Sequence, residues 1–285
     1  MSPIASHPPV FVLVHGAWHG AWCWRRVLPL LRAGGHEAHA VTLTGVGERA
    51  HLLNERVTLQ THIDDVIGLI TAEELHHVVL VGHSFGGLVI TGVADALQQR
   101  APGVLRQLVY LDALVPRPGE SWSSTHTPET VAARVGAAQA SGGLSFPPPD
   151  AAVFGLDGAD RDWVNRRQTP QPLAVYQAPL HFDAERVARL PRCFIDCPQP
   201  ALATIAVGTC ASYGGIAAAV PFVSSFKPSE KAKAAGAAVE ADISALKPGE
   251  KMTVEWRGKP VWIVRRTPEQ LAGAGNLCQR HAGVC

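Results

Sequence analysis

Residues 82–86 read Gly-His-Ser-Phe-Gly and lie between two segments of different character. The apolar run 78–81 before them is typical of a buried strand, and the pattern that begins at Gly87 is typical of a helix. A serine between two glycines at such a strand–turn–helix junction predicts a sharp turn that exposes the serine hydroxyl above a sheet. The glycines fit, because a Cβ atom would clash in so tight a turn. We therefore expect Ser84 to be a nucleophile; an ordinary glycine-rich turn is the alternative.

A second glycine-containing turn follows an earlier strand pattern. Residues 11–14 are apolar throughout, and His-Gly-Ala-Trp-His-Gly follows at 15–20. In enzymes with such a serine turn, a backbone N–H after an early strand and the N–H after the nucleophile together stabilise the developing negative charge. We therefore expect the N–H groups of Ala17 and Phe85 to form an oxyanion hole.

Six stretches of the chain carry a resemblance to a known family: FVLVHGAWHGAWCW, TLTGVGERAHL, THIDDV, VVLVGHSFGGLVITGVAD, LVYLDALVPRPGES and TPQPLA. Through them, residues from about 9 to about 205 resemble a bacterial α/β-hydrolase subfamily of small esterases. Its relatives include plant hydroxynitrile lyases and methylesterases and a carbendazim-hydrolysing esterase. The resemblance implies a hydrolase of small carboxylic esters or related carbonyl compounds that uses no cofactor and no metal.

Strand and helix patterns alternate along the first part of the chain, which predicts a mainly parallel sheet with helices on both faces. This is the α/β-hydrolase fold that the resemblance implies, and we assign it to a core of residues 1–205. The predicted strands are 10–14, 39–43, 78–81 and 108–111, the predicted helices are 24–33, 59–72 and 87–99, and 44–53 is a predicted loop.

Residues 116–189 interrupt the alternation and are rich in Pro, Gly, Ser and Ala. In this fold such an insertion forms a cap over the active site, and its aromatic side chains either line the substrate pocket or pack the cap onto the sheet. No obvious cluster of charge accompanies them, so we expect a small neutral ester or carbamate with an apolar or aromatic group. The expected pocket residues are Trp18, His19, Trp122, Phe146 and Trp163, and Phe154 is a further aromatic residue of the cap.

A serine nucleophile of this kind needs an acid and a base. Asp112 follows the strand pattern 108–111, where catalytic groups of open α/β sheets gather, and the resemblance favours it as the acid. Asp196 ends the next predicted strand and is the alternative. In the family a Gly-His-Asp segment supplies the base, and the sequence contains no such segment; His281, in a context that does not match, is the remaining candidate.

The composition excludes some classes of partner and location. A net charge of +1 argues against nucleic acid as a partner, because binding to phosphate needs a basic excess. No charged and then apolar signal segment opens the chain, so a cytoplasmic protein is expected. Six scattered cysteines do not form a disulfide framework. The sequence does not indicate an oligomeric state.

The C-terminal part has a different character. Residues 201–226 are apolar, almost free of charge and long enough to span a bilayer, and 252–264 predicts two strands around an Arg-Gly-Lys turn. Residues from about 209 to about 270 resemble the anchor, linker and first hairpin of a bacterial Rieske iron–sulfur subunit, without its two Cys-and-His cluster loops. We therefore expect an α/β-hydrolase core truncated at its C-terminal end and joined to an anchor-like tail, 206–285, that could reach the inner membrane.

Three functions are compatible with these patterns. The first is a serine esterase, impaired because the histidine-bearing segment is missing. The alternatives are a membrane-anchored fragment of a Rieske-type electron-transfer subunit and a hydroxynitrile lyase-type C–C lyase, which shares the fold and the triad.

Overall fold

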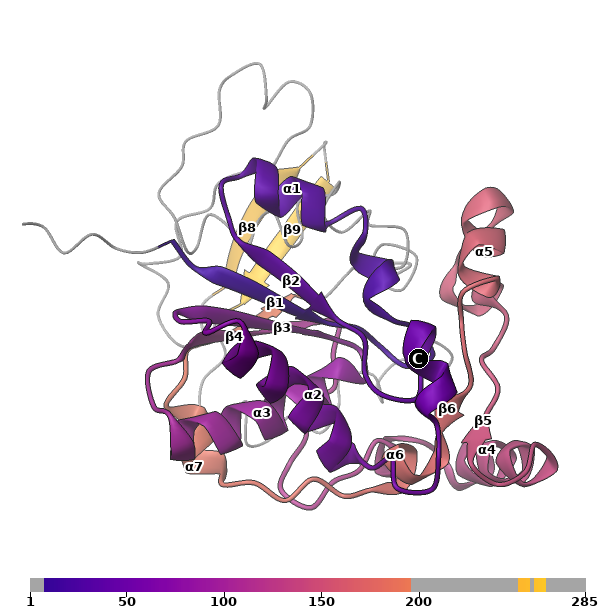
Figure 1. The fold of residues 1–285 in the computed structure, drawn as a ribbon. Helices are drawn as coiled ribbons and strands as arrows, with labels where there is room; N and C mark the ends of the chain where they lie inside the picture. The colour runs from indigo at the N-terminus through magenta and orange to yellow at the C-terminus, as the bar shows by residue number, and fades with distance from the viewer. Residues whose placement is uncertain (1–7, 196–250, 257–258, 265–285) are drawn as a thin grey trace, which may run out of the picture.

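The computed structural model describes residues 8–195, 251–256 and 259–264 (Figure 1). Its main sheet has five parallel strands in the order β2-β1-β3-β4-β7, which confirms the predicted parallel sheet. The strands are β1 (Val10–Val14), β2 (Ala38–Val41), β3 (Val78–His83), β4 (Leu105–Leu111) and β7 (Arg192–Ile195).

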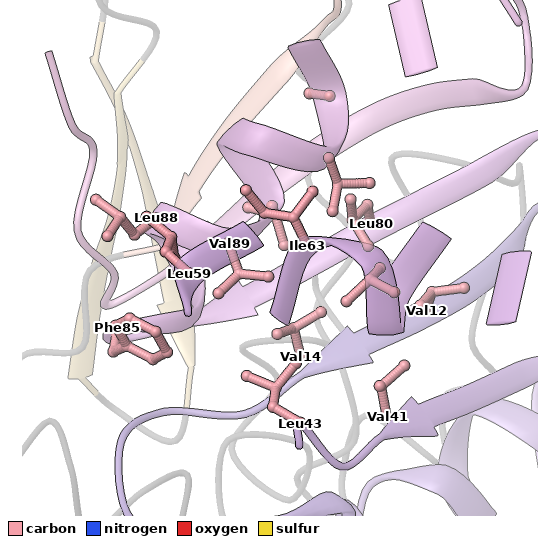
Figure 2. Packing of buried hydrophobic residues seen from close by; sticks show 14 of the residues in the cluster. Val12, Val14, Val41, Leu43, Leu59, Ile63, Leu80, Phe85, Leu88 and Val89 are labelled. Carbon is pink, nitrogen blue, oxygen red and sulfur yellow. The ribbon is translucent and has the colours of Figure 1, made fainter. Parts of the chain in front are cut away.

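Helices cover both faces of this sheet (Figure 1). They are the 3-10 helix η1 (Ala21–Trp24) with α1 (Leu28–Ala33) on one face, and α2 (Leu59–Ala72) with α3 (Gly86–Arg100) on the other. Alternate side chains of each strand point to opposite faces. Phe11 and Leu13 of β1 pack with Trp24, whereas Val12 and Val14 pack with α2 and α3. Figure 2 shows the second of these clusters. Because both faces of the central strands β1 and β3 are buried, these two strands are apolar over almost their whole length.

Helix α2 begins and ends where the sequence predicts. The side chains and backbone N–H groups of Thr58 and Thr61 form a reciprocal capping box at its start. The predicted loop 44–53, in contrast, contains a 3-10 helix, η2 (Gly47–Leu52). Its six residues do not place apolar side chains at helical spacing, so the sequence gives no signal for this helix. Long-range contacts hold it instead: the Arg49 guanidinium donates to Thr42 O at 3.0 Å and pairs with Asp65 at 3.0 Å.

The expected cap segment, 116–189, forms two groups of elements. The first group stands beside the sheet (Figure 1) and comprises η3 (Ser123–Thr125), α4 (Pro128–Ala140), β5 (Ser145–Phe146), η4 (Ala151–Phe154), α5 (Gly158–Asn165) and β6 (Gln171–Pro172). The second group packs back on the core: α6 (Leu173–Gln177) contacts α2, and α7 (Ala184–Ala188) contacts α3. Arg186 and Asp95 form an ion pair of 2.8 Å between α7 and α3. The chain therefore leaves the core, forms the first group, and returns to the core before β7.

The predicted hairpin in the C-terminal part is confirmed. Strands β8 (Lys251–Trp256) and β9 (Lys259–Val264) pair antiparallel, with Trp256 opposite Lys259. The apolar stretch 201–226 lies outside the described residues. Among the residues that are described, no helix is both long enough and apolar enough to cross a bilayer. The membrane anchor therefore stays a prediction.

Two histidines, His15 and His62, are buried and are held by hydrogen bonds in their neutral form. His15 Nδ1 donates to Gly16 O at 2.7 Å, and its Nε2 accepts from Leu43 N–H at 3.1 Å. His62 Nε2 donates to Thr44 O at 2.8 Å. Burial lowers the pKa of each from 6.5 to about 4. Both side chains therefore stay neutral in the folded protein at pH values where they are protonated in the unfolded chain.

We predict that the free energy of unfolding falls as the pH falls from 6.5 toward 4. The folded pKa values are depressed, so the unfolded chain takes up protons that the folded chain does not, and stability is complete only above the unfolded pKa. Each histidine should contribute about 1–2 kcal/mol of this loss by pH 5. Urea unfolding at several pH values measures it. His62→Gln should make the pH dependence shallower, whereas His76→Gln, at an exposed position, should not; equal slopes for both variants would contradict the assignment.

Candidate active site

Ser84 occupies the sharp turn between β3 and α3. Its φ is 50°, in the left-handed region that residues with a side chain rarely adopt. Its carbonyl accepts N–H groups from Gly87 at 3.0 Å and Leu114 at 2.9 Å, and its own N–H donates to Leu111 O at 3.4 Å. Ser84 is partly exposed, whereas the residues on either side of it are buried. Ser84 is therefore the one residue of the turn that solvent reaches.

The glycines around Ser84 permit the close approach of three backbone segments. A Cβ on Gly82 would lie 2.7 Å from Gly86 O, and a Cβ on Gly86 would lie 2.8 Å from His15 O. A Cβ on Gly87 would overlap the carbonyl oxygen of Leu114. Each distance is shorter than a real Cβ contact, so these three positions have no room for a side chain. The requirement for glycine that the sequence suggested is therefore steric at each of the three.

The two expected oxyanion donors lie at this turn. Phe85 is the N-cap residue of α3, and Ala17 belongs to the loop after β1. This loop packs directly on the serine turn, because a Cβ on Gly16 would lie 3.1 Å from Ser84 Cβ. Neither the N–H of Ala17 nor that of Phe85 donates a hydrogen bond within the described part of the chain. Two backbone donors are thus available beside Ser84, and one of them is at the positive end of a helix dipole.

Gln171, which the sequence analysis did not single out, holds the loop after β1 in place. Trp18 has a φ of 63°, and its N–H donates to Gln171 Oε1 at 2.9 Å. The Trp18 carbonyl accepts Thr169 N–H at 3.0 Å, and Thr169 Oγ1 accepts Gly47 N–H at 2.8 Å. Gln171 is 1% exposed, so its amide has no competing water. The segment before and within β6 therefore fixes the strained residue that follows Ala17.

One of the two candidate acids, Asp112, lies at the end of a strand next to the serine turn. Asp112 directly follows β4 and has a φ of 44°. Its N–H donates to Ile195 O at 2.7 Å, at the end of β7. The hydrogen bonds of Ser84 with Leu111 and Leu114 fall on either side of Asp112, so the turn after β4 is joined to the serine turn. Asp196 follows Ile195 and lies outside the described residues, so the choice between the two acids stays a prediction.

The structure does not bring a described histidine to the nucleophile. In residues 8–195, 251–256 and 259–264, no hydrogen bond joins a histidine to Ser84 Oγ. His19 and His83 lie close together, with ring centroids 6.4 Å apart, and none of their ring nitrogens has a hydrogen-bond partner. Burial lowers the pKa of both, to about 3 for His83, so they are neutral. His281 lies outside the described residues, and the base is therefore not identified.

Most of the expected pocket residues come together beside the serine turn. The Trp18 ring contacts those of Trp122 and Phe146 at centroid distances of 5.6 and 5.8 Å. Trp122 also lies 5.3 Å from the ring of Phe85.

Trp163 is separate from this group: its ring lies 5.1 Å from that of Trp22, in a small cluster with η4 and α5. His19 and Phe154, 6.2 Å apart, lie between the two groups, because His19 also contacts Trp22 and Phe154 also contacts Trp18.

The aromatic group contains a cation that the sequence analysis missed. Arg134 of α4 places its Cζ atom 4.9 Å from the Trp122 ring centroid and 5.0 Å from that of Tyr176. The rings of Trp18 and Phe146 lie 5.5 and 5.7 Å from the same atom. Arg134 Nη1 is buried and makes no hydrogen bond. Nothing in the helical pattern of α4 distinguishes this arginine from one that points to solvent, so the sequence alone gave no signal.

The fold agrees with the comparison to known families. The sequence profile of the alpha/beta hydrolase family matches residues 11–206, and the chain belongs to that family. A carbendazim hydrolyzing esterase of Nocardioides sp. (strain SG-4G) is 51% identical over 179 residues, which are 60% of this chain and 72% of that protein. Methylesterase 2 of Arabidopsis thaliana is 38% identical over 128 residues, 42% of this chain and 47% of its own length. The predicted resemblance is therefore confirmed.

Two further similarities concern the fold and the C-terminal part. An extracellular alpha/beta-hydrolase from a Paenibacillus species, described as sharing structural and functional homology with tobacco salicylic acid binding protein 2, has a TM-score of 0.58 and 27% identity over 66% of this chain and 76% of its own. An iron–sulfur subunit of ubiquinol-cytochrome c reductase from Allochromatium vinosum is 66% identical over 55 residues, 19% of this chain and 27% of that protein. The chain thus spans less than half the length of the methylesterase and about a quarter of the iron–sulfur subunit.

We predict that Gln171→Leu lowers the free energy of unfolding by about 1–3 kcal/mol, because it leaves the buried Trp18 N–H without an acceptor. Gln139→Leu on the exposed side of α4 is the matched control and should change it by less than about 0.5 kcal/mol. Denaturant unfolding of both variants measures the difference. Equal effects would show that the hydrogen bond to Trp18 does not hold the loop.

Proposed function

We propose that this protein is a serine hydrolase that cleaves a small carboxylic ester or carbamate by acyl transfer to Ser84. The observation that carries the proposal is the position of Ser84 on a strained turn beside two backbone N–H groups that have no other acceptor in the described chain. The name of the carbendazim esterase relative supports the reaction class. The sequence-based expectation of a neutral substrate rested on a pocket without charge, and it did not take account of Arg134.

In the proposed reaction, Ser84 Oγ attacks the substrate carbonyl and loses its proton to a base. The oxyanion then accepts hydrogen bonds from the N–H groups of Ala17 and Phe85, which are aligned before the reaction and need no reorganisation. The alcohol half leaves as the bond to the acyl carbon breaks, and water later releases the acid. An aspartate, for which Asp112 is proposed, would orient the base.

Turnover is expected to be low. The sequence contains no Gly-His-Asp segment, and general-base catalysis of this kind contributes about 100- to 10,000-fold to the rate. The remaining rate would come from the oxyanion donors and from substrate binding.

We predict that a fluorophosphonate probe labels Ser84 slowly and labels no other serine. Intact-protein mass spectrometry should show one adduct on the full chain and none on Ser84→Ala. Ser141→Ala, at an exposed serine of the cap, is the control and should label like the parent. Labelling that persists in Ser84→Ala, or that is absent from the parent, would contradict the proposal.

We also predict that Asp112 is the acid. In a chimera that carries the family's Gly-His-Asp segment after residue 205, Asp112→Asn should reduce kcat by several orders of magnitude, because the histidine would be held in the wrong tautomer (a loss of roughly 10,000-fold is known for such a change). Hydrolysis of a short-chain nitrophenyl ester measures it. A larger loss in Asp196→Asn, with the fold intact, would assign the acid to Asp196 instead.

The 55-residue similarity to an iron–sulfur subunit supports a second candidate, in which the C-terminal part anchors the chain at the inner membrane. Fractionation of cells that express the full chain distinguishes this candidate from a cytoplasmic enzyme. The sequence lacks the cluster loops, so electron transfer is not part of the proposal. A hydroxynitrile lyase-type reaction would use the same Ser84 without a covalent adduct in turnover.

A further inference from the structure

Arg134 is a partly buried cation with no anion beside it among the described residues. Its Nη1 atom is closed off from solvent and has no hydrogen-bond partner, and Arg134 forms no ion pair among the described residues. Burial lowers the pKa of its guanidinium, and Tyr176 is the neighbour that opposes this effect. The other titratable side chain close to it is His126, whose pKa burial and Arg134 lower to about 4. No described carboxylate therefore balances this charge.

The four rings around Arg134 do not complete its interactions. Rings attract a cation through their faces, with about 0.5–2 kcal/mol for each significant contact, but they do not accept the in-plane N–H groups of a guanidinium. A planar guanidinium is built to donate two parallel hydrogen bonds to a carboxylate. The Tyr176 hydroxyl accepts a hydrogen bond from the guanidinium, and the Nη1 atom is the donor that has no acceptor among the described residues.

The Arg134 site adjoins the proposed oxyanion donors. Trp18, which stacks on one side of it, directly follows Ala17. Trp122, whose ring centroid lies 4.9 Å from the Cζ atom, contacts the ring of Phe85. Arg134 is thus linked through Trp18 to Ala17 and through Trp122 to Phe85, the two residues whose N–H groups bind the oxyanion in the proposed mechanism. The aromatic group around Arg134 therefore lies next to both residues that supply the proposed oxyanion donors.

We infer that Arg134 binds a carboxylate that the substrate carries apart from its reacting ester group, with the aromatic rings holding the ring or chain to which this carboxylate is attached. This inference rests on the proposed function, and it replaces the expectation of a neutral substrate by that of an ester that carries a separate carboxylate. The Tyr176 hydroxyl, 3.4 Å from His126 Nδ1, accepts from the guanidinium, and its own O–H remains a donor that the bound carboxylate would use.

The test compares benzoate with benzamide, which has the same shape and no charge. Titrations of the full chain are followed by tryptophan fluorescence, because Trp18 and Trp122 both contact Arg134. We expect benzoate to bind at least tenfold more tightly than benzamide. Arg134→Gln should reduce the ratio to about one, and Arg134→Lys, which keeps the charge and loses the planar fork, should give an intermediate ratio.

Arg167→Gln is the matched control, because Arg167 also stacks on a tryptophan of the cap, 4.9 Å from the ring centroid of Trp163. It should keep the preference for benzoate. No preference in the parent chain, a preference that survives Arg134→Gln, or its loss in Arg167→Gln would each overturn the inference, and the first two would leave Arg134 as a clamp that only holds the cap. Binding needs no base, so benzoate that binds while Ser84 resists the fluorophosphonate would refute the proposed function alone.

Discussion

The backbone of Ser84 is the constraint on which the rest of the site depends. A residue with a side chain in the left-handed region costs about 1–3 kcal/mol and persists only when its surroundings enforce it. Here the enforcement is visible: β3 and α3 are buried on both sides of the turn, and the carbonyl of Ser84 is held by two N–H groups. Three neighbouring glycines let the strands and the helix approach closely enough to impose the turn.

The same strain recurs where the other parts of the site meet the serine turn. Trp18 and Asp112 also have positive φ values, of 63° and 44°. Each is tied by hydrogen bonds to a different segment, Trp18 to Gln171 and Asp112 to Ile195. The loop after β1 is thus joined to the segment before α6, and the turn after β4 to the end of β7, each through a residue in an unfavourable conformation. In the proposed mechanism these conformations position the reacting groups at the expense of local stability.

The parts of this structure that could be predicted are those with a local signal. Three such signals were sufficient to predict structure: the helical period of α2, the apolar run of β3 and the glycines around Ser84. In each case the sterics and burial that determine the structure act within a few residues of the chain. The 3-10 helix η2 was missed because Arg49 and Asp65 hold it through contacts far along the chain. Gln171 and Arg134 were missed for the same reason: their roles come from partners that only the folded chain brings near. The expectations for Asp196, His281 and 201–226 fall outside the described residues and stay predictions.

The central claim is that Ser84 and the N–H groups of Ala17 and Phe85 surround one reacting carbonyl. A crystal structure of the protein after reaction with a fluorophosphonate tests it most directly, because the phosphoryl oxygen takes the place of the oxyanion. We predict that this oxygen lies about 2.7–3.1 Å from both backbone nitrogen atoms. A phosphoryl oxygen that points to solvent, with either N–H bonded elsewhere, would contradict the account.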